Sequence, residues 1–181
     1  LGKLYQDGVY FNKDMDQAMK WFRAAAELGN EYAAYRMGCL LLLGEKIPKD
    51  VEAAVKWLSL SAEKGNPYAQ YRLGMLYLKG EVLSPQVEVA MKWLQQAAEQ
   101  KNEWAFYQLG KLYLSGEHVT KNVETAVHYL GLCAEKGNQY AQYVLGKLYL
   151  CGRDVSRDRE KAVEYLTASA EQGNLYASFL L

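Results

Sequence analysis

Hydrophobic and small residues recur at helical spacing along the chain, and the stretch from residue 31 to residue 64 shows the pattern clearly. One face of a helix over residues 31–43 would carry Ala33, Met37, Leu40 and Leu41. The inner face of a second helix would carry Ala54, Trp57, Leu58 and Ser61. Between them, residues 44–49 contain Gly44 and Pro48, which interrupt helices. The pattern predicts two helices, Glu31–Leu43 and Val51–Lys64, joined by a short turn.

The residues at the predicted helix ends are typical caps. Asp50 precedes the second helix and can accept a hydrogen bond from its first turn. Gly65 follows that helix, where a left-handed backbone conformation is often required. Asn66 can cap the next helix, and Pro67 then occupies its favoured first position. The turn between successive helix pairs is therefore expected to be very tight.

The whole pattern repeats every 36 residues without an insertion or deletion. Two glycine series follow this interval, Gly2, Gly38, Gly74, Gly110, Gly146 and Gly8, Gly44, Gly80, Gly116, Gly152. So do an alanine series and an aromatic series, Ala18, Ala54, Ala90, Ala126, Ala162 and Trp21, Trp57, Trp93, Tyr129, Tyr165. Asparagine recurs at Asn30, Asn66, Asn102, Asn138 and Asn174. So many residues that recur at the same 36-residue interval indicate an internal repeat.

A helix pair with one apolar face per helix cannot bury that face alone, whereas stacked pairs can. By analogy with other helix-pair repeats we predict an all-α fold, a right-handed α-solenoid of five 36-residue helix–turn–helix repeats. Residues 1–181 are expected to form a single array. Its units would be a partial unit 1–29, complete units 30–65, 66–101, 102–137 and 138–173, and the start of a further unit at 174–181.

Two features of the glycine series carry physical consequences. Gly38 and its equivalents lie in the middle of a helix, where glycine costs about 1 kcal/mol relative to alanine. Close approach of a neighbouring helix or aromatic ring is expected to offset that cost. Lys101 stands where other units have Gly29, Gly65, Gly137 and Gly173. A left-handed conformation there would strain the lysine backbone by about 1 kcal/mol.

Two segments carry a specific resemblance. Residues 68–77 read YAQYRLGMLY and are followed by Gly80, Ala90, Trp93 and the run Ala97-Ala98-Glu99; residues 140–149 read YAQYVLGKLY. These segments resemble the Sel-1-like repeat family, a relative of the tetratricopeptide repeats, and the resemblance extends over the whole chain. It implies a scaffold or adaptor for protein partners and not an enzyme. Secreted bacterial members often carry a disulfide in every repeat, and this chain lacks such cysteine pairs.

Charge and composition narrow the expected partners. The 181 residues include 21 Lys and Arg against 21 Asp and Glu, a formal net charge of zero. This balance argues against nucleic-acid binding through these repeats and against a polybasic membrane anchor, although it can hide a local patch. No apolar run approaches the roughly 20 residues of a membrane span. Three unpaired cysteines and no visible signal peptide favour a cytoplasmic location.

The sequence offers little that would indicate catalysis or metal binding. It contains no Walker loop, dinucleotide-binding glycine fingerprint or HExxH motif. His118 and His128 have no second ligand at metal-binding spacing. Cys133 aligns with Ala25, Ser61, Ala97 and Ser169, which indicates a small packed residue. We expect no catalysis, no metal and no cofactor.

The positions that vary between units are the best binding candidates. On the first helix of each complete unit they form a variable stripe: Arg36, Cys39, Leu43; Arg72, Met75, Lys79; Gln108, Lys111, Ser115; and Val144, Lys147, Cys151. An aromatic series flanks the stripe at Tyr32, Tyr68, Trp104, Tyr140 and Tyr176. Phe106 stands where other units have Ala, Gln or Ser. In helix-pair solenoids the first helices usually line the concave surface, and aromatic residues and arginine dominate interface energetics.

We therefore predict that a protein or peptide partner binds in a concave groove. The predicted contact residues are Arg36, Arg72, Met75, Trp104, Phe106, Gln108, Lys111, Lys147, Tyr32, Tyr68 and Tyr140. For the tyrosines, packing between repeats is the competing explanation.

Three other interpretations remain open. Similar repeats occur at the tails of bacterial multidomain proteins such as DNA-mobilisation relaxases, so the chain could be such a tail. An engineered repeat array would also be strictly periodic. Leu1 and Leu181 occupy equivalent positions inside a first helix, which suggests a fragment or head-to-tail packing between molecules.

Overall fold

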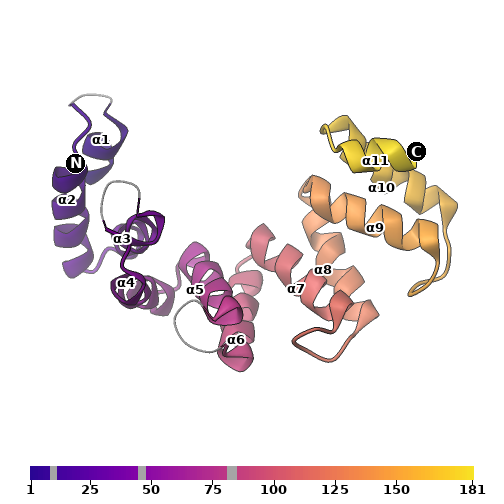
Figure 1. Ribbon diagram of the computed structural model, residues 1–181, viewed down its shortest axis with the longest axis horizontal. Coiled ribbons are helices and arrows are strands. Elements are labelled where there is room, and N and C mark those ends of the chain that lie inside the picture. The colour runs from indigo at the N-terminus through magenta and orange to yellow at the C-terminus, as the bar shows by residue number, and fades with distance from the viewer. Residues whose placement is uncertain (9–11, 45–47, 81–84) are drawn as a thin grey trace. The chain divides into compact units, whose positions relative to one another are not determined.

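The computed structural model describes residues 1–8, 12–44, 48–80 and 85–181, and in these residues all regular structure is helical (Figure 1). The chain divides into two compact units, Leu1–Gln100 and Lys101–Leu181. The first unit contains α1 (Gly2–Asp7), α2 (Met15–Glu27), α3 (Glu31–Leu43), α4 (Val51–Glu63), α5 (Pro67–Lys79) and α6 (Val87–Glu99). The second contains α7 (Glu103–Ser115), α8 (Val123–Glu135), α9 (Gln139–Cys151), α10 (Arg159–Glu171) and α11 (Leu175–Leu180).

The predicted helical repeat is confirmed. Helix α3 has the bounds expected from the sequence, and α4 ends one residue before the predicted Lys64. The predicted inner-face residues of α3 are all buried, and on α4 only Trp57 is partly exposed. The first helices of the complete repeats, α3, α5, α7 and α9, are each followed by a second helix, α4, α6, α8 and α10.

Asparagine side chains fix the tight turns between repeats. The Oδ1 atom of Asn30 accepts a hydrogen bond of 2.8 Å from the backbone N–H of Ala33 at the start of α3. The same cap recurs at Asn66, Asn102, Asn138 and Asn174. Asp14, Asp50, Asn122 and Asp158 cap the second helices in the same way. At α6 the preceding residue is Gln86, whose side chain makes no such bond.

The mid-helix glycines allow the two helices of a repeat to lie against each other. A Cβ atom added to Gly38 would lie 2.5 Å from Leu58 Cγ and 3.1 Å from the carbonyl oxygen of Ala54. Gly74, Gly110 and Gly146 meet Leu94, Leu130 and Leu166 in the same way. The expected close approach is thus made by the neighbouring helix, and Leu58 can be fully buried because Gly38 has no side chain.

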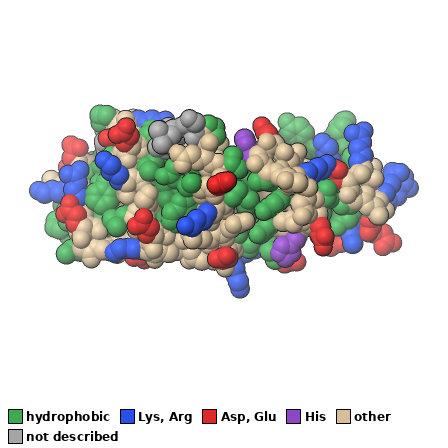
Figure 2. Space-filling model, turned by 90° about the horizontal axis from the view of Figure 1, so that it is seen from below, with side chains coloured by type: hydrophobic (Ala, Val, Ile, Leu, Met, Phe, Trp, Pro, Cys, Tyr) green, Lys and Arg blue, Asp and Glu red, His purple; other side chains and the backbone are tan. Residues whose placement is uncertain are grey.

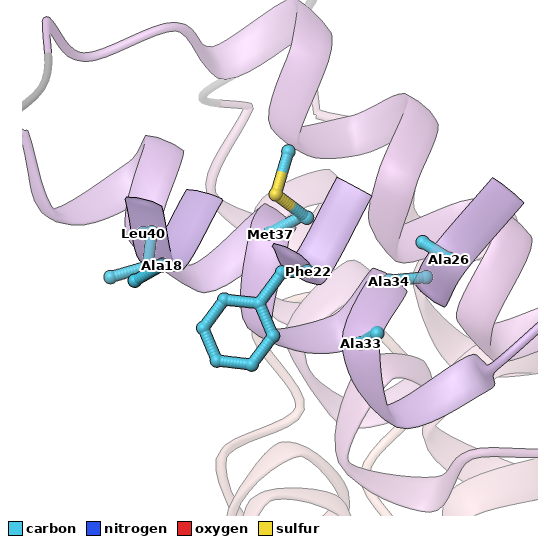
Figure 3. Packing of buried hydrophobic residues seen from close by; sticks show 7 residues of the cluster. All are labelled: Ala18, Phe22, Ala26, Ala33, Ala34, Met37 and Leu40. Atoms are coloured by element: carbon cyan, nitrogen blue, oxygen red, sulfur yellow. The ribbon is translucent and has the colours of Figure 1, made fainter. Parts of the chain in front are cut away.

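The core of each unit is built from alanine and leucine on the facing sides of the helices. Figure 3 shows one cluster between α2 and α3, made of Ala18, Phe22, Ala26, Ala33, Ala34, Met37 and Leu40. The largest fully buried side chains elsewhere are mostly leucines in the interior of each repeat. On the face shown in Figure 2, hydrophobic side chains reach the surface among Lys, Arg, Asp and Glu.

The structure confirms the predicted left-handed conformation of Lys101. Its φ is 61°, whereas glycine occupies the equivalent position after the other second helices, with φ between 84° and 95°. Among the described residues, no other non-glycine residue has a positive φ.

Candidate functional site

A hollow on the surface of the first unit is lined by the variable stripe. It has a volume of about 270 Å³ and lies between α3 and α5, the first helices of two successive repeats. Its lining residues are Cys39, Leu42 and Leu43 from α3 and Arg72, Met75, Leu76 and Lys79 from α5. Five of these belong to the variable stripe, so residues selected because they differ between repeats meet around one cavity. We call this cavity the α3–α5 groove.

Two leucines of the groove were missed by the sequence analysis. Leu42 and Leu76 belong to leucine series that recur every 36 residues, so they were read as part of the repeated core. Leu76 is indeed 5 % exposed. The groove is therefore a place where the apolar core comes to the surface between two first helices.

Arg72, Tyr35 and Cys39 interact electrostatically beside the groove. Arg72 is exposed and lines the groove together with Cys39, and Tyr35 lies one turn before Cys39 on α3. Burial, followed by the neighbouring Cys39, raises the pKa of Tyr35 to about 12, against the opposing effect of Arg72. Burial also raises the pKa of the Cys39 thiol. Tyr35 links the two helices, and the sequence analysis missed it because an aromatic residue recurs at its position in every unit.

Residues of the aromatic series pack against neighbouring rings and also keep exposed surface. The ring centroids of Tyr32 and Tyr35 are 6.3 Å apart, and those of Tyr35 and Tyr68 are 6.1 Å apart, so the rings connect successive repeats. Tyr32 and Tyr68 nevertheless keep 47 % and 53 % of their surface exposed. Each ring therefore packs against a neighbour on one side and is available to a partner on the other.

In the second unit the predicted residues form a related but different surface on α7 and α9. The Tyr107 and Tyr140 ring centroids are 6.3 Å apart, and Lys111 Nζ lies 5.4 Å from the Tyr107 ring centroid. This distance is typical of a cation–π contact. Trp104, Lys111, Tyr140 and Lys147 are exposed, and Gln108 is half-buried. In the first unit, Arg36 and Met75 are likewise half-buried.

The prediction for Phe106 is wrong. Its side chain is only 6 % exposed and packs against Tyr129, with ring centroids 6.2 Å apart. The position therefore faces the interior in this repeat. Where Gln70 and Gln142 occupy it, their side chains accept hydrogen bonds of 2.8 Å from Gln100 and Gln172. Phe106 has Lys136 at the paired position, so no glutamine pair is formed there.

The cysteines show no arrangement suited to nucleophilic catalysis. Cys133 is buried as predicted, and its thiol donates to the backbone oxygen of Glu103 at 3.3 Å. Ser61 and Ser169 make the equivalent bond at 2.7 Å. Burial, followed by Glu103, raises the pKa of Cys133 to about 12. Among the residues that the structure describes, no three His, Cys, Asp or Glu side chains could together hold a metal ion.

Charge is distributed unequally between the two kinds of helix. The first helices α3, α5, α7 and α9 carry five basic residues, Arg36, Arg72, Lys79, Lys111 and Lys147, against two acidic ones, Glu31 and Glu103. Both acidic residues stand at the first position of their helix. The second helices contain an excess of acidic residues. Helices α3 and α5, which line the groove, therefore carry a net positive charge although the chain as a whole is neutral.

In the described part of the chain, no helix has the length and apolar character that crossing a membrane requires.

Three solved structures from bacteria are similar to this chain. A protective antigen of uropathogenic Escherichia coli with an SLR fold matches 99 % of the chain at 32 % identity and a TM-score of 0.95. The chain spans 38 % of the length of that antigen. A Sel1 repeat protein from Oxalobacter formigenes matches 97 % of the chain at 34 % identity and a TM-score of 0.89, over 72 % of its own length. An immunity protein from Pseudomonas aeruginosa matches 90 % of the chain at 26 % identity and a TM-score of 0.59, over 60 % of its length.

No curated protein matches the chain in sequence. Neither a relaxase tail nor an engineered array gains support from these comparisons. Sel1 repeat proteins are generally scaffolds for protein interactions and typically have no catalytic activity of their own. The model of the Sel1 repeat matches residues 1–30, 31–66, 67–102, 105–138 and 139–174. Because these five repeats account for nearly all of its length, the chain belongs to the Sel1 repeat family.

Proposed function

We propose that this chain is a protein-interaction scaffold that holds a segment of a partner protein in the α3–α5 groove and catalyses no reaction of its own. One observation carries the proposal: five residues that differ between repeats line a single cavity of about 270 Å³. The repeated residues build the solenoid, and residues free to differ between repeats gather where a partner could be recognised.

The groove offers the kinds of contact that stabilise protein interfaces. Its apolar surface comes from leucine side chains and Met75, a flexible residue that adapts to different partners. Arg72 lines it, and Tyr32 and Tyr68, which belong to the same two helices, are exposed. Arginine and tyrosine are the residue types enriched among the contacts that dominate binding energy. A peptide segment lying across successive first helices could use all of them.

Site-specific photo-crosslinking tests the proposal. The photoreactive amino acid p-benzoylphenylalanine would replace Met75 in the groove, and in a second variant Lys56, an exposed residue of the second helix α4. Both proteins would be irradiated in lysate of the source organism, and the adducts identified by mass spectrometry. The scaffold proposal expects a discrete protein adduct from the Met75 position and none of that mass from the Lys56 position.

A competing variant separates specific capture from chance labelling. Unlabelled chain should suppress the Met75 adduct, whereas unlabelled chain carrying Arg72→Glu and Leu43→Asp, two changes in the groove lining, should suppress it less. Equal adducts from both positions, or equal suppression by both competitors, would show that the groove is not the binding surface.

A further inference from the structure

The second unit carries a surface of its own on α7 and α9, away from the α3–α5 groove. Each helix contributes two aromatic residues and a lysine, and the two sets are equivalent residues of successive repeats: Trp104, Tyr107, Lys111 and Tyr140, Tyr143, Lys147. Spacings of three and four residues place each set on one side of its helix. We call these six residues the α7–α9 face. Its outer rings, Trp104 and Tyr140, are 43 % and 51 % exposed, and both lysines are exposed.

Contacts between the rings position the Lys111 ammonium group on this face. The Tyr107 and Tyr140 ring centroids are 6.3 Å apart, so the two helices are joined here, and Lys111 Nζ lies over the Tyr107 ring at 5.4 Å. Burial, followed by Cys133 and Tyr140, raises the pKa of Tyr107, so this ring is neutral at physiological pH. A cation–π contact with a neutral ring orients the ammonium group and leaves its positive charge uncompensated.

Neither lysine of the face has a carboxylate partner. Among the described residues of the second unit, ion pairs join Lys121 to Asp154 and Lys161 to Asp158, and neither Lys111 nor Lys147 takes part in one. Helix α9 contains no acidic residue. The one acidic residue of α7 is Glu103, eight residues before Lys111, which corresponds to about 12 Å along a helix axis. The face is therefore positively charged, although it belongs to a chain without net charge.

We propose that the α7–α9 face is a second binding surface and takes an acidic segment of a partner protein. Carboxylates of the segment meet Lys111 and Lys147 in charge-assisted hydrogen bonds. An apolar side chain of the segment packs against the exposed rings of Trp104 and Tyr140, which are residue types that contribute strongly to protein interfaces. The inference goes beyond the proposed function, because it assigns a separate surface, of different chemistry, to the other unit.

The same face is poorly suited to a nucleic acid. A nucleic-acid strand carries a phosphate at every nucleotide and is bound by many Lys and Arg side chains, whereas this face has two lysines. Bases also need open ring faces on which to stack. The half-buried Tyr107 ring lies under Lys111 and against Tyr140, so it does not offer such a face. A peptide with two carboxylates matches the charge that is present.

Peptide selection with a depletion step tests this inference on the full chain. Phage that display random 12-residue peptides would first be depleted on an immobilised variant carrying Trp104→Ala, Lys111→Gln and Lys147→Gln, and then selected on the unchanged protein. Depletion removes peptides that bind elsewhere, including the α3–α5 groove. We expect the surviving peptides to combine an apolar residue with at least two Asp or Glu residues. The best one, synthesised with a fluorescent label, should show a Kd by anisotropy that rises with salt concentration.

Matched lysine variants identify the charged contacts. Lys111→Gln combined with Lys147→Gln should raise the Kd of this peptide about tenfold, and replacing the acidic residues of the peptide by their amides should do the same. Lys56→Gln combined with Lys92→Gln removes two exposed cations from second helices, so it makes the same change in net charge. This control should alter the Kd less than about twofold, because exposed charges outside the contact are screened.

A pair of aromatic variants separates the two units. Trp104→Ala should raise the Kd about tenfold. Tyr68 occupies the equivalent position in the first unit and is 53 % exposed, and Tyr68→Ala should leave the Kd unchanged. Circular dichroism melting would verify that each variant is folded.

The inference is overturned if no peptide survives depletion, if the survivors lack acidic residues, or if the two lysine pairs affect binding equally. A single-stranded dT12 oligonucleotide that binds as tightly as the best peptide and displaces it would overturn the inference in favour of a nucleic acid. Photo-crosslinking at Met75 reports on the α3–α5 groove alone, so the proposed function can fail or succeed independently of these results.

Discussion

Gly110 of α7 lies directly against Leu130 of α8: a Cβ atom added to the glycine would be 2.6 Å from Leu130 Cγ. Leu130 is fully buried, so it has little room to move. We expect Gly110→Ala to lower the free energy of unfolding by about 1–3 kcal/mol through overpacking, in spite of the better helix propensity of alanine. Urea denaturation would measure the change.

The same repeat contains a control. Gly131 follows Leu130 in α8, and a Cβ atom added there would meet nothing within 4 Å. Gly131→Ala should therefore stabilise the protein by up to about 1 kcal/mol through helix propensity alone. If the two substitutions shifted the urea midpoint in the same direction, the steric explanation for the glycine series would be wrong.

The glutamine pair of α5 is expected to be energetically coupled. Gln100 Nε2 donates to Gln70 Oε1 at 2.8 Å, and Gln70 Nε2 donates to the Ala62 carbonyl oxygen at 3.1 Å. A double-mutant cycle with Gln70→Ala and Gln100→Ala should give a coupling of about 0.5–1.5 kcal/mol, because removal of Gln100 leaves a buried acceptor without this donor. Additive effects of the two changes would contradict the assigned bond.

The three thiols should differ widely in reactivity. Cys151 is exposed, whereas Cys133 is buried and its pKa is raised to about 12. At pH 8 the thiolate fraction of Cys133 is then about 10⁻⁴, and the thiolate is the reacting species. Titration with a disulfide reagent should show one rapid thiol that Cys151→Ser removes. Rapid labelling of Cys133 in the folded protein would mean that the α7–α8 pair opens readily.

Exchanging lysine and glycine at equivalent positions of two repeats tests whether the backbone of Lys101 is strained. Lys101→Gly should raise the free energy of unfolding by about 0.5–1 kcal/mol, since glycine adopts a φ of 61° without the steric penalty of a Cβ atom. Gly137→Lys should do the reverse, because Gly137 has a φ of 84° at the equivalent position after α8. Thermal or urea denaturation of both variants checks the sign. Two shifts of the same sign would exclude strain as the cause.

Ionisation of the Tyr35 hydroxyl should lower the free energy of unfolding at alkaline pH. Its pKa is raised to about 12 in the folded chain, against an ordinary value near 10. Between these values the unfolded chain releases the tyrosine proton while the folded chain retains it, so the free energy of unfolding falls as pH rises from 10 to 12. Tyr35→Phe should remove part of this dependence, measured by urea denaturation at several pH values. An unchanged slope would show that Tyr35 ionises normally.

The sequence predicted the solenoid because every local signal in it agreed. Asn66 caps α5, Gly38 faces Leu58, and Lys101 adopts the left-handed conformation that its alignment with glycines required. Each of these features depends on the residue and its near neighbours along one helix pair. Such local features recur with the repeat, so the periodicity of the sequence is enough to predict them.

The groove and the Phe106 error show where that reasoning stops. Variation between repeats drew attention to Arg72 and Met75, which line the groove, but it does not distinguish an exposed position from one that faces the interior. Phe106 is buried against Tyr129, whereas in two other repeats the glutamine at its position pairs with a glutamine 30 positions later in the chain. Leu42 and Tyr35 were overlooked for the opposite reason, since they recur in every repeat and still help to form or flank a surface feature.

The separation of charge between first and second helices gives a neutral chain an electric dipole moment. A neutral molecule feels no net force in a uniform electric field, but its dipole moment experiences a torque that rotates the molecule. An approaching polyanion would therefore rotate the first unit until α3 and α5 face it, before any contact forms. At physiological salt the field extends only about 8 Å, so this turning occurs in the last moments of an encounter. An isoelectric point near 6.9 conceals this property.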